Sequence, residues 1–381
     1  MKFASIVPYT QHGRVWDLSE DKLEYYPDSI FGLTVAMRGE HVPLLSLKLG
    51  KISNNIYHNY IAPRMAKINY AGYSKISKLL NRAFDNFHNL QYITRFEVVV
   101  ISIHDYSIQE MAKLILAAKK IRKRPVFLGV LNNTFNSFRE AFKDRDNFRY
   151  FKIFLDNCDA FLNWGHEAIS DYLGFYTKTP IINFPMSYHF EFAKSFFELH
   201  ENKEKIILVS GHESRIDDVA SMLVAKKIQD RHPDFMIEVI RRRSLNTEPL
   251  KKSKFRIIPF LGWENYISHL RKTYVIIDMD DTWTLGRVAN DAAVAGTPCI
   301  GINAGSQLRL FPDLVCEDVS GINKAVEMGI KLIKDVKFYK KIQRKALERL
   351  EKYSYRNSVK EFERILRRLR LIDIRGKQWK K

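Results

Sequence analysis

The chain has 381 residues, which is room for two domains of ordinary size, and its hydrophobic content of 46% can fill two cores. Its three cysteines, Cys158, Cys299 and Cys316, lack the paired spacing of a metal site, which indicates buried thiols in a reducing compartment. No apolar stretch approaches the ~20 residues that span a bilayer, and residues 1–10 lack a secretory pattern. We therefore expect a cytoplasmic protein, either soluble or peripheral at a membrane.

The net charge of +19 is concentrated near the end of the chain. Residues 337–381 contain 17 lysines and arginines against 5 acidic residues, a net charge of +12. Such a segment predicts an anionic partner: a phosphorylated acceptor, a membrane surface or, with less support, nucleic acid. The alternative is a solvated helix face without a partner.

The first half of the chain alternates predicted strands and helices. The predicted strands cover residues 3–7, 97–103 and 125–131. The predicted helices cover residues 28–38, 108–122 and 148–155. This alternation is typical of a doubly wound parallel sheet.

The second half repeats the pattern after a charged stretch at residues 200–205. The predicted strands are 206–210, 235–240, 255–260 and 274–277, and a helix is expected at 219–229. Residues 338–369 are predicted to be helical, with Phe362, Ile365, Leu366 and Leu369 on one apolar face. The predicted fold class is α/β, with two doubly wound Rossmann-like sheets.

The stretch from Pro259 to Gly301 carries the most information. Tyr274 to Ile277 is an apolar run typical of a strand that is covered on both faces, and three aspartates follow it. Ligands of open parallel sheets bind at the carboxyl ends of the strands. Gly286 precedes a helix rich in Ala and Val, and the N–H groups at its start could receive a phosphate. The alternative is a plain α/β crossover in which an Asp caps the helix.

Three short motifs stand out in this stretch: Leu285-Gly286, Val288 to Ala293, and Ala295-Gly296-Thr297-Pro298. They resemble the nucleotide-sugar half of glycosyltransferases with the two-domain GT-B fold, especially the glycogen-synthase-like retaining group. The resemblance implies two Rossmann-like domains facing each other across a cleft. It places an acceptor-side domain in residues 1–200, a nucleotide-sugar-binding domain in residues 201–355, and a basic helix or tail that returns to the first domain in residues 356–381.

The resemblance extends to three other segments. Residues 39–45 resemble the family's junction between a helix and an apolar strand, so a strand that includes Leu44 and Leu45 is expected. Residues 159–164 resemble a strand of the family, and residues 179–185 occupy the place of the segment that ends the N-terminal domain. Because the final helix of GT-B enzymes returns to the first domain, the resemblance implies that its apolar face packs against protein rather than lipid.

The resemblance implies a leading role for one carboxylate. Asp291 aligns with the second Glu of the family's Glu-x7-Glu motif and would bind the ribose hydroxyls, since a carboxylate can accept hydrogen bonds from a vicinal diol. The first Glu aligns with Trp283, so we expect Asp280 and Asp281, from the same turn, to contribute to catalysis. Asp278-x-Asp280 matches the metal-binding motif of the other glycosyltransferase fold, but we expect no metal here. The alternative for Asp291 is an ordinary acid on a helix surface.

Other residues complete the predicted site. The family's Arg-x4-Lys phosphate pair is not intact, and Arg215 and Arg241 are the expected substitutes. Trp263 either stacks on the nucleotide base or belongs to the core. His104 is expected to act in the cleft or to be a structural histidine. The predicted catalytic residues are Asp280, Asp281 and His104, and the predicted nucleotide-sugar-binding residues are Gly13, Gly211, Arg215, Arg241, Gly262, Trp263, Leu285, Gly286, Arg287 and Asp291.

These features predict a glycosyltransferase of the hexosyltransferase class. It would move a sugar from a nucleotide diphosphate sugar to an acceptor, with retention and without a metal or other cofactor. A nucleotide-sugar epimerase of the same fold is one alternative. A non-catalytic nucleotide-sugar or nucleic-acid binding protein is another, because two family motifs are incomplete. The donor sugar, the base, the acceptor and the oligomeric state stay open.

Overall fold

The structure is a computed structural model that describes two compact units. The described residues are 1–7, 29–48, 86–131, 135–185, 187–209, 218–240, 247–259, 261–281, 283, 286–302 and 304–372. Unit 1 consists of Met1–Met186 with Ser358–Lys381, and unit 2 is Ser187–Asn357. The sequence predicts limits at residues 200 and 355. The structure groups residues from Ser187 onward with unit 2, because the helix α10 (Phe190–Ala193) packs against α13 (Arg287–Ala295).

Unit 1 contains a six-stranded parallel sheet with the strand order β2-β1-β3-β4-β5-β6. Its strands are β1 (Phe3–Val7), β2 (Glu40–Pro43), β3 (Val98–Ile103), β4 (Val126–Leu131), β5 (Ala160–Asn163) and β6 (Ile181–Asn183). Every residue of β1 and β3 is buried, which explains their continuous apolar runs. The strand expected to include Leu44 and Leu45 ends at Pro43 instead, and these two leucines begin the helix α2.

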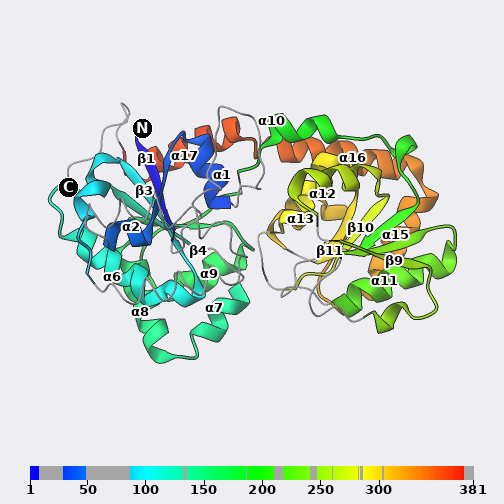
Figure 1. Ribbon diagram of the computed structural model, residues 1–381, viewed down its shortest axis with the longest axis horizontal. Helices are drawn as coiled ribbons and strands as arrows, with labels where there is room; N and C mark the ends of the chain where they lie inside the picture. Colours follow the sequence, from blue (N-terminus) through cyan, green and yellow to red (C-terminus); the bar gives the residue numbers. More distant parts are fainter. Residues whose placement is uncertain are drawn as a thin grey trace. The chain divides into compact units, whose positions relative to one another are not determined.

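Helices cover both faces of this sheet. They are α1 (Ser29–Ala36), α2 (Leu44–Lys48), α6 (Ile108–Lys119), α7 (Phe135–Ala141), α8 (Arg145–Asn157), α9 (Ala168–Gly174) and most of α17 (Tyr355–Arg368). In Figure 1, α6 and α8 lie on one side of the sheet and α1 and α17 on the other. The Phe362 ring of α17 lies 5.7 Å from the rings of both Phe3 and Phe184. The apolar face of α17 therefore packs against protein, as the sequence predicts.

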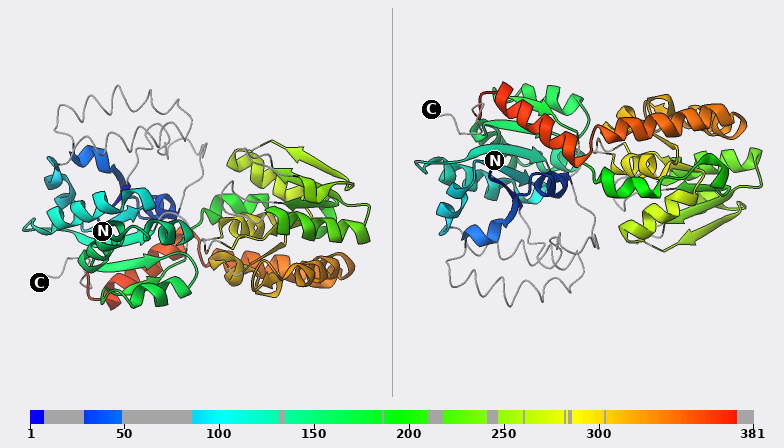
Figure 2. Two further views of the ribbon diagram at one scale, coloured as in Figure 1. Left: turned by 90° about the horizontal axis from the view of Figure 1, so that it is seen from below. Right: turned by 90° about the horizontal axis from the view of Figure 1, so that it is seen from above.

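Unit 2 contains a second six-stranded parallel sheet, with the strand order β12-β11-β10-β7-β8-β9. Its strands are β7 (Ile206–Val209), β8 (Met236–Ile240), β9 (Phe255–Ile258), β10 (Val275–Asp278), β11 (Cys299–Ile302) and β12 (Val315–Cys316). Ile207, Ile276 and Ile300 lie on three neighbouring strands, and their side chains are fully buried. Figure 2 shows the sheet and its helices from two further directions. The predicted fold class, two doubly wound parallel sheets flanked by helices, is confirmed.

The helices of unit 2 lie in two groups. In addition to α10 and α13 they are α11 (Asp218–Arg231), α12 (Trp263–Lys272), α14 (Gly305–Leu310), α15 (Ile322–Lys334) and α16 (Val336–Glu351). α11 packs against α15, whereas α13 packs against α12, α14 and α16. Short 3₁₀ turns lie at Leu90–Arg95, Asp105–Ser107, Lys194–Phe196, His200–Asn202, Glu248–Leu250 and Pro312–Leu314.

The long helix predicted over residues 338–369 is two helices, α16 and α17. The break falls at Lys352–Ser354, where Ser354 Oγ accepts a hydrogen bond from Asn357 N at 3.3 Å, as a helix-capping serine does. Tyr188 N donates to Tyr353 O at 2.8 Å, and Tyr188 forms an isolated parallel bridge with Ser354. The break therefore coincides with a contact to a segment far away in the sequence, which helical periodicity cannot reveal.

Candidate functional site

The sheet of unit 2 has one point where its connections diverge. From β7 the chain continues to β8 on one side, while β10 lies on the other side of β7 and continues to β11. Ligands of doubly wound sheets bind outside the carboxyl ends of the strands at such a point. The residues that directly follow β7 are outside the described part of the chain. Asp278, Asp280 and Asp281, at the end of β10, are within it.

The acidic turn after β10 is partly fixed by its neighbours. Met279 N donates a hydrogen bond to Ser221 Oγ of α11 at 3.2 Å. Asp280 is half-buried and Asp281 is exposed. Trp283, which takes the place of the family's first Glu, is 40% exposed and has a φ of +52°, a left-handed conformation that bulky residues rarely adopt. The catalytic roles of Asp280 and Asp281 stay a prediction.

The start of α13 requires glycine. Gly286 has a φ of +72°, and a Cβ there would lie 3.2 Å from Ala304 Cβ and 3.4 Å from Ser306 N. Gly286 itself has no side chain with which to cap this end of α13, and the first turn of the helix contains no acidic residue. The first N–H groups of a helix lack intrahelical partners and carry a partial positive charge. The start of α13 is therefore chemically suited to an anion.

Asp291 is buried one turn into α13. Its side chain is only 5% exposed, and Oδ1 accepts hydrogen bonds from Tyr188 Oη at 2.8 Å and from Trp263 Nε1 at 3.2 Å. Oδ2 lies 3.9 Å from Nε of Arg287, the first residue of the helix. These contacts exclude the alternative of an ordinary acid on a helix surface. They bring together three of the predicted residues, Trp263, Arg287 and Asp291.

Trp263, one of the two donors to this carboxylate, belongs to a group of packed aromatic side chains. The His189 ring stacks on Phe192 at 5.4 Å and on Tyr355 at 4.9 Å, and the Phe192 ring lies 5.9 Å from Trp263. Burial raises the pKa of Tyr355 well above its ordinary value; Glu191 raises it further and Arg287 lowers it. Trp263 itself is 8% exposed, so its ring belongs to this packed group rather than to an open surface.

The remaining predicted residues have different surroundings. Gly262 precedes α12 and has open space around it, since a Cβ would meet no atom within 4 Å. His104 belongs to unit 1, where it follows β3 between the diverging strands β1 and β3, is 8% exposed and packs its ring 5.0 Å from Tyr106. The other five predicted site residues lie outside the described part of the chain: Gly13, Gly211, Arg215, Arg241 and Leu285.

Tyr188 is the residue of this site that sequence reasoning misses. It is 103 positions from Asp291 in the chain and 1% exposed. It precedes a short helix in a segment without a recognised motif. No periodicity or spacing in the sequence connects it to Asp291, so only the folded structure reveals the pair.

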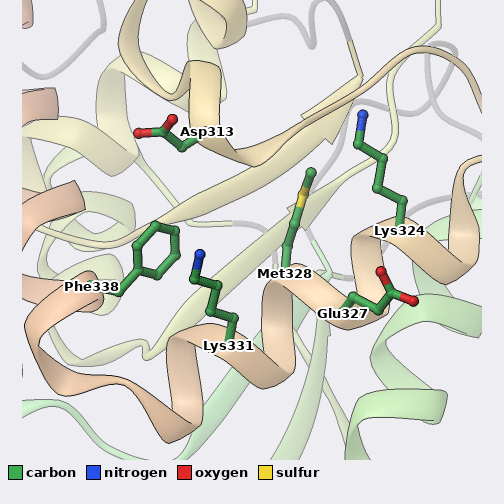
Figure 3. Close-up of a pocket in the computed structure, with 6 residues that line it drawn as sticks. All are labelled: Asp313, Lys324, Glu327, Met328, Lys331 and Phe338. Atoms are coloured by element: carbon green, nitrogen blue, oxygen red, sulfur yellow. The ribbon is translucent and has the colours of Figure 1, made fainter.

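A separate cavity of about 290 Å³ lies beside α15 (Figure 3). It is lined by Asp313, Lys324, Glu327, Met328, Lys331 and Phe338. The Lys331 ammonium lies 4.3 Å from the centre of the Phe338 ring. The residues that line this cavity include both acidic and basic side chains and none of the predicted site residues. The site at the carboxyl ends of the strands is therefore the stronger candidate.

Within the described ranges, no group of three or more His, Cys, Asp or Glu side chains could hold a metal ion. In the same part of the chain, no helix is long and apolar enough to cross a membrane.

The chain is similar to solved structures over nearly its whole length. The apo structure of OtsA matches 96% of this chain and 99% of its own, with a TM-score of 0.63 and 10% identity. A sucrose-phosphate synthase from Thermosynechococcus elongatus matches 97% and 98%, with a TM-score of 0.60 and 12% identity. The chain has the GT-B fold. No protein-family model and no curated protein matches its sequence.

Other GT-B structures show the same likeness together with ligands. One from E. coli, described as trehalose-6-phosphate bound with UDP-2-fluoro glucose, has a TM-score of 0.61 and 11% identity and covers 96% of this chain and 99% of its own. A mutant of S. aureus TarM, in complex with fondaparinux, α-GlcNAc-glycerol and UDP, has a TM-score of 0.56 and 12% identity over 76% of this chain and 58% of its own. At these identities the likeness establishes the fold of this chain.

Proposed function

We propose that the protein is a glycosyltransferase that uses a nucleotide diphosphate sugar as donor. One observation carries the proposal: at the carboxyl ends of the unit 2 strands, α13 starts at a left-handed Gly286 and has a buried carboxylate, Asp291, one turn later. An anion-binding helix start beside a hydrogen-bond acceptor matches the two polar parts of a nucleoside diphosphate, its phosphates and its ribose.

Each residue of the proposed site would have a separate role in the transfer reaction. The N–H groups at the start of α13, with Arg287, would offset the charge that develops on the departing diphosphate. Asp291 would accept hydrogen bonds from the ribose. Asp280 and Asp281 would contact the transferred sugar or the acceptor, and His104 of unit 1 would supply a further polar group. Gly13, Gly211, Arg215, Arg241, Gly262 and Leu285 complete the proposed donor site.

The finer features rest on the resemblance of residues 259–301 to retaining GT-B enzymes. We propose hexosyl transfer with retention at the anomeric carbon and without a divalent metal or other cofactor. We further propose an anionic acceptor or a membrane surface as partner of the basic end of the chain, with nucleic acid less favoured, and a cytoplasmic location.

The deciding experiment is a panel of nucleotide diphosphate sugars tested on the full chain. Binding is measured by calorimetry and slow donor hydrolysis by release of the nucleoside diphosphate. We expect one donor to bind and to be turned over, and turnover should persist in excess chelator. NMR of the transfer product then gives the anomeric configuration. Turnover that chelator abolishes and manganese or magnesium restores would contradict metal independence.

The same panel separates the alternatives. Conversion of the donor without an acceptor, to a sugar of changed configuration, would identify an epimerase. Binding without any turnover would identify a binding protein. Failure of every donor and every nucleoside diphosphate to bind would sink the proposal itself.

A further inference from the structure

The two oxygens of the Asp291 carboxylate have different surroundings. Oδ1 accepts two protein hydrogen bonds, from Tyr188 Oη and from Trp263 Nε1. Oδ2 lies toward Arg287, whose side chain is 36% exposed. One carboxylate oxygen has about two lone-pair sites. The two donors therefore match the capacity of Oδ1, and Oδ2 is the oxygen that lies on the Arg287 side of the carboxylate.

We propose that Tyr188 and Trp263 are positioning residues that orient Asp291 so that Oδ2 faces the ribose hydroxyls of a nucleoside diphosphate. This inference rests on the proposed function. The terminal torsion of an aspartate is broad, so the carboxylate plane has little preference of its own. Two donors on one oxygen fix that plane. Aspartate is also one methylene shorter than the glutamate of the family motif, so its direction decides whether it reaches a ligand.

Both donors are themselves held in place. Tyr188 is 1% exposed, and its backbone is fixed by the hydrogen bond to Tyr353 O and by the bridge to Ser354. Trp263 is the first residue of α12, is 8% exposed and packs against Phe192. A group must be supported by packing and by hydrogen bonds before it can orient another group precisely enough for binding. Tyr188 and Trp263 meet this condition.

The test compares ribose recognition with overall affinity. Diphosphates of uridine, guanosine, adenosine and cytidine are titrated against the full chain by calorimetry, each with its 2′,3′-dideoxy analogue. For the base that binds, the parent should prefer the ribose form by about tenfold or more, because hydrogen bonds to a charged acceptor are strong. Tyr188→Phe and Trp263→Phe, which each remove one donor, should reduce this preference to about threefold or less.

Tyr339→Phe is the matched control. Tyr339 is a fully buried tyrosine of unit 2 that donates to Tyr274 O at 2.6 Å, so its loss also removes a buried hydrogen bond. It should lower the melting temperature like Tyr188→Phe while keeping the ribose preference of the parent. An unchanged preference in Tyr188→Phe and Trp263→Phe, or equal weakening of both analogues, would overturn this inference alone. No binding by the parent would overturn the proposed function as well, whereas binding without any ribose preference would overturn this inference and the ribose role of Asp291 but not the proposed use of a nucleotide donor.

Discussion

At the residue scale, Asp291 connects stability with the proposed binding. Asp291→Ala would leave Tyr188 Oη and Trp263 Nε1 buried without their acceptor, at a cost of about 1–3 kcal/mol for each unsatisfied group. We therefore expect a clear fall in the free energy of unfolding, together with a loss of about tenfold or more in donor affinity. Urea unfolding and calorimetry measure the two effects.

Asp313→Ala is the control, because Asp313 is exposed and its substitution should change neither quantity. If Asp291→Ala left stability unchanged, the contacts to Tyr188 and Trp263 would not be contributing. If it lost stability but kept donor affinity, Asp291 would have a structural role only.

The amine of Lys203 should make the free energy of unfolding depend on pH. Its Nζ donates to Ala295 O at 2.9 Å and to Thr297 Oγ1 at 2.8 Å. Burial lowers the pKa of Lys203 from 10.5 to about 7, so between these values the unfolded chain binds more protons than the folded protein. The free energy of unfolding should therefore rise with pH across this window.

Lys203→Met should flatten that rise, because it removes the titrating amine. Lys205→Met is the control: this lysine is exposed and pairs with Asp234 at the surface. Chemical denaturation at several pH values within the window gives the slopes. Equal slopes for the parent and Lys203→Met would refute the assignment.

At the scale of elements, the start of α13 is the feature most sensitive to a single methyl group. Gly286→Ala would force alanine into a left-handed conformation, at a cost of roughly 1–2 kcal/mol, and would crowd Ala304. We expect lower thermal stability and weaker nucleoside diphosphate binding, because the N–H groups of α13 would shift.

Gly174→Ala is the control, at a glycine outside the proposed donor site. Gly174 ends α9, lacks the left-handed φ of Gly286 and has no neighbour close to the position of an added Cβ. The variant should fold and bind as the parent does. Similar losses in the two variants would mean that the backbone of Gly286 has no special role.

Most elements of the fold can be predicted from the sequence, because apolar runs and the Gly and Pro residues between them are local signals. The strand Phe3–Val7 agrees at both ends, and β8 and β10 agree to within one residue. The break between α16 and α17 and the end of β2 at Pro43 differ from the prediction. Asp291 could be singled out because it aligns with the second Glu of the motif in the GT-B enzymes that residues 259–301 resemble. Its partner Tyr188 could not, since only tertiary packing brings them together.

At the scale of the whole molecule, the basic end of the chain determines what the protein could bind besides a donor. Phe362 and Leu366 of α17 are fully buried, whereas Arg364, Arg367, Arg368 and Arg370 are exposed. The apolar face is thus already covered by protein, and only the charged face can meet a partner. An attraction of this kind should be screened by salt.

We expect substitution by Gln at Arg367, Arg368, Arg370, Lys380 and Lys381 to weaken co-sedimentation with anionic vesicles at low salt. Donor hydrolysis should hardly change, because none of these residues is in the proposed donor site. The control variant has the same change in total charge, because Gln replaces five exposed lysines elsewhere in the chain. These are Lys143, Lys205, Lys227, Lys251 and Lys272. Equal binding by the parent and both variants would show that the charge is only a solvated surface.

The bridge between Tyr188 and Ser354 has a consequence for how the protein is made. Unit 2 is a continuous segment whose two ends meet there, while unit 1 is built from two stretches of chain that unit 2 separates. During synthesis, all of unit 2 leaves the ribosome before Phe362 of α17 becomes available to Phe3 and Phe184. The second unit can therefore finish folding first, while the part of the first-made sheet that α17 covers is still exposed. We expect nascent chains at this stage to depend on chaperones more than the finished protein does.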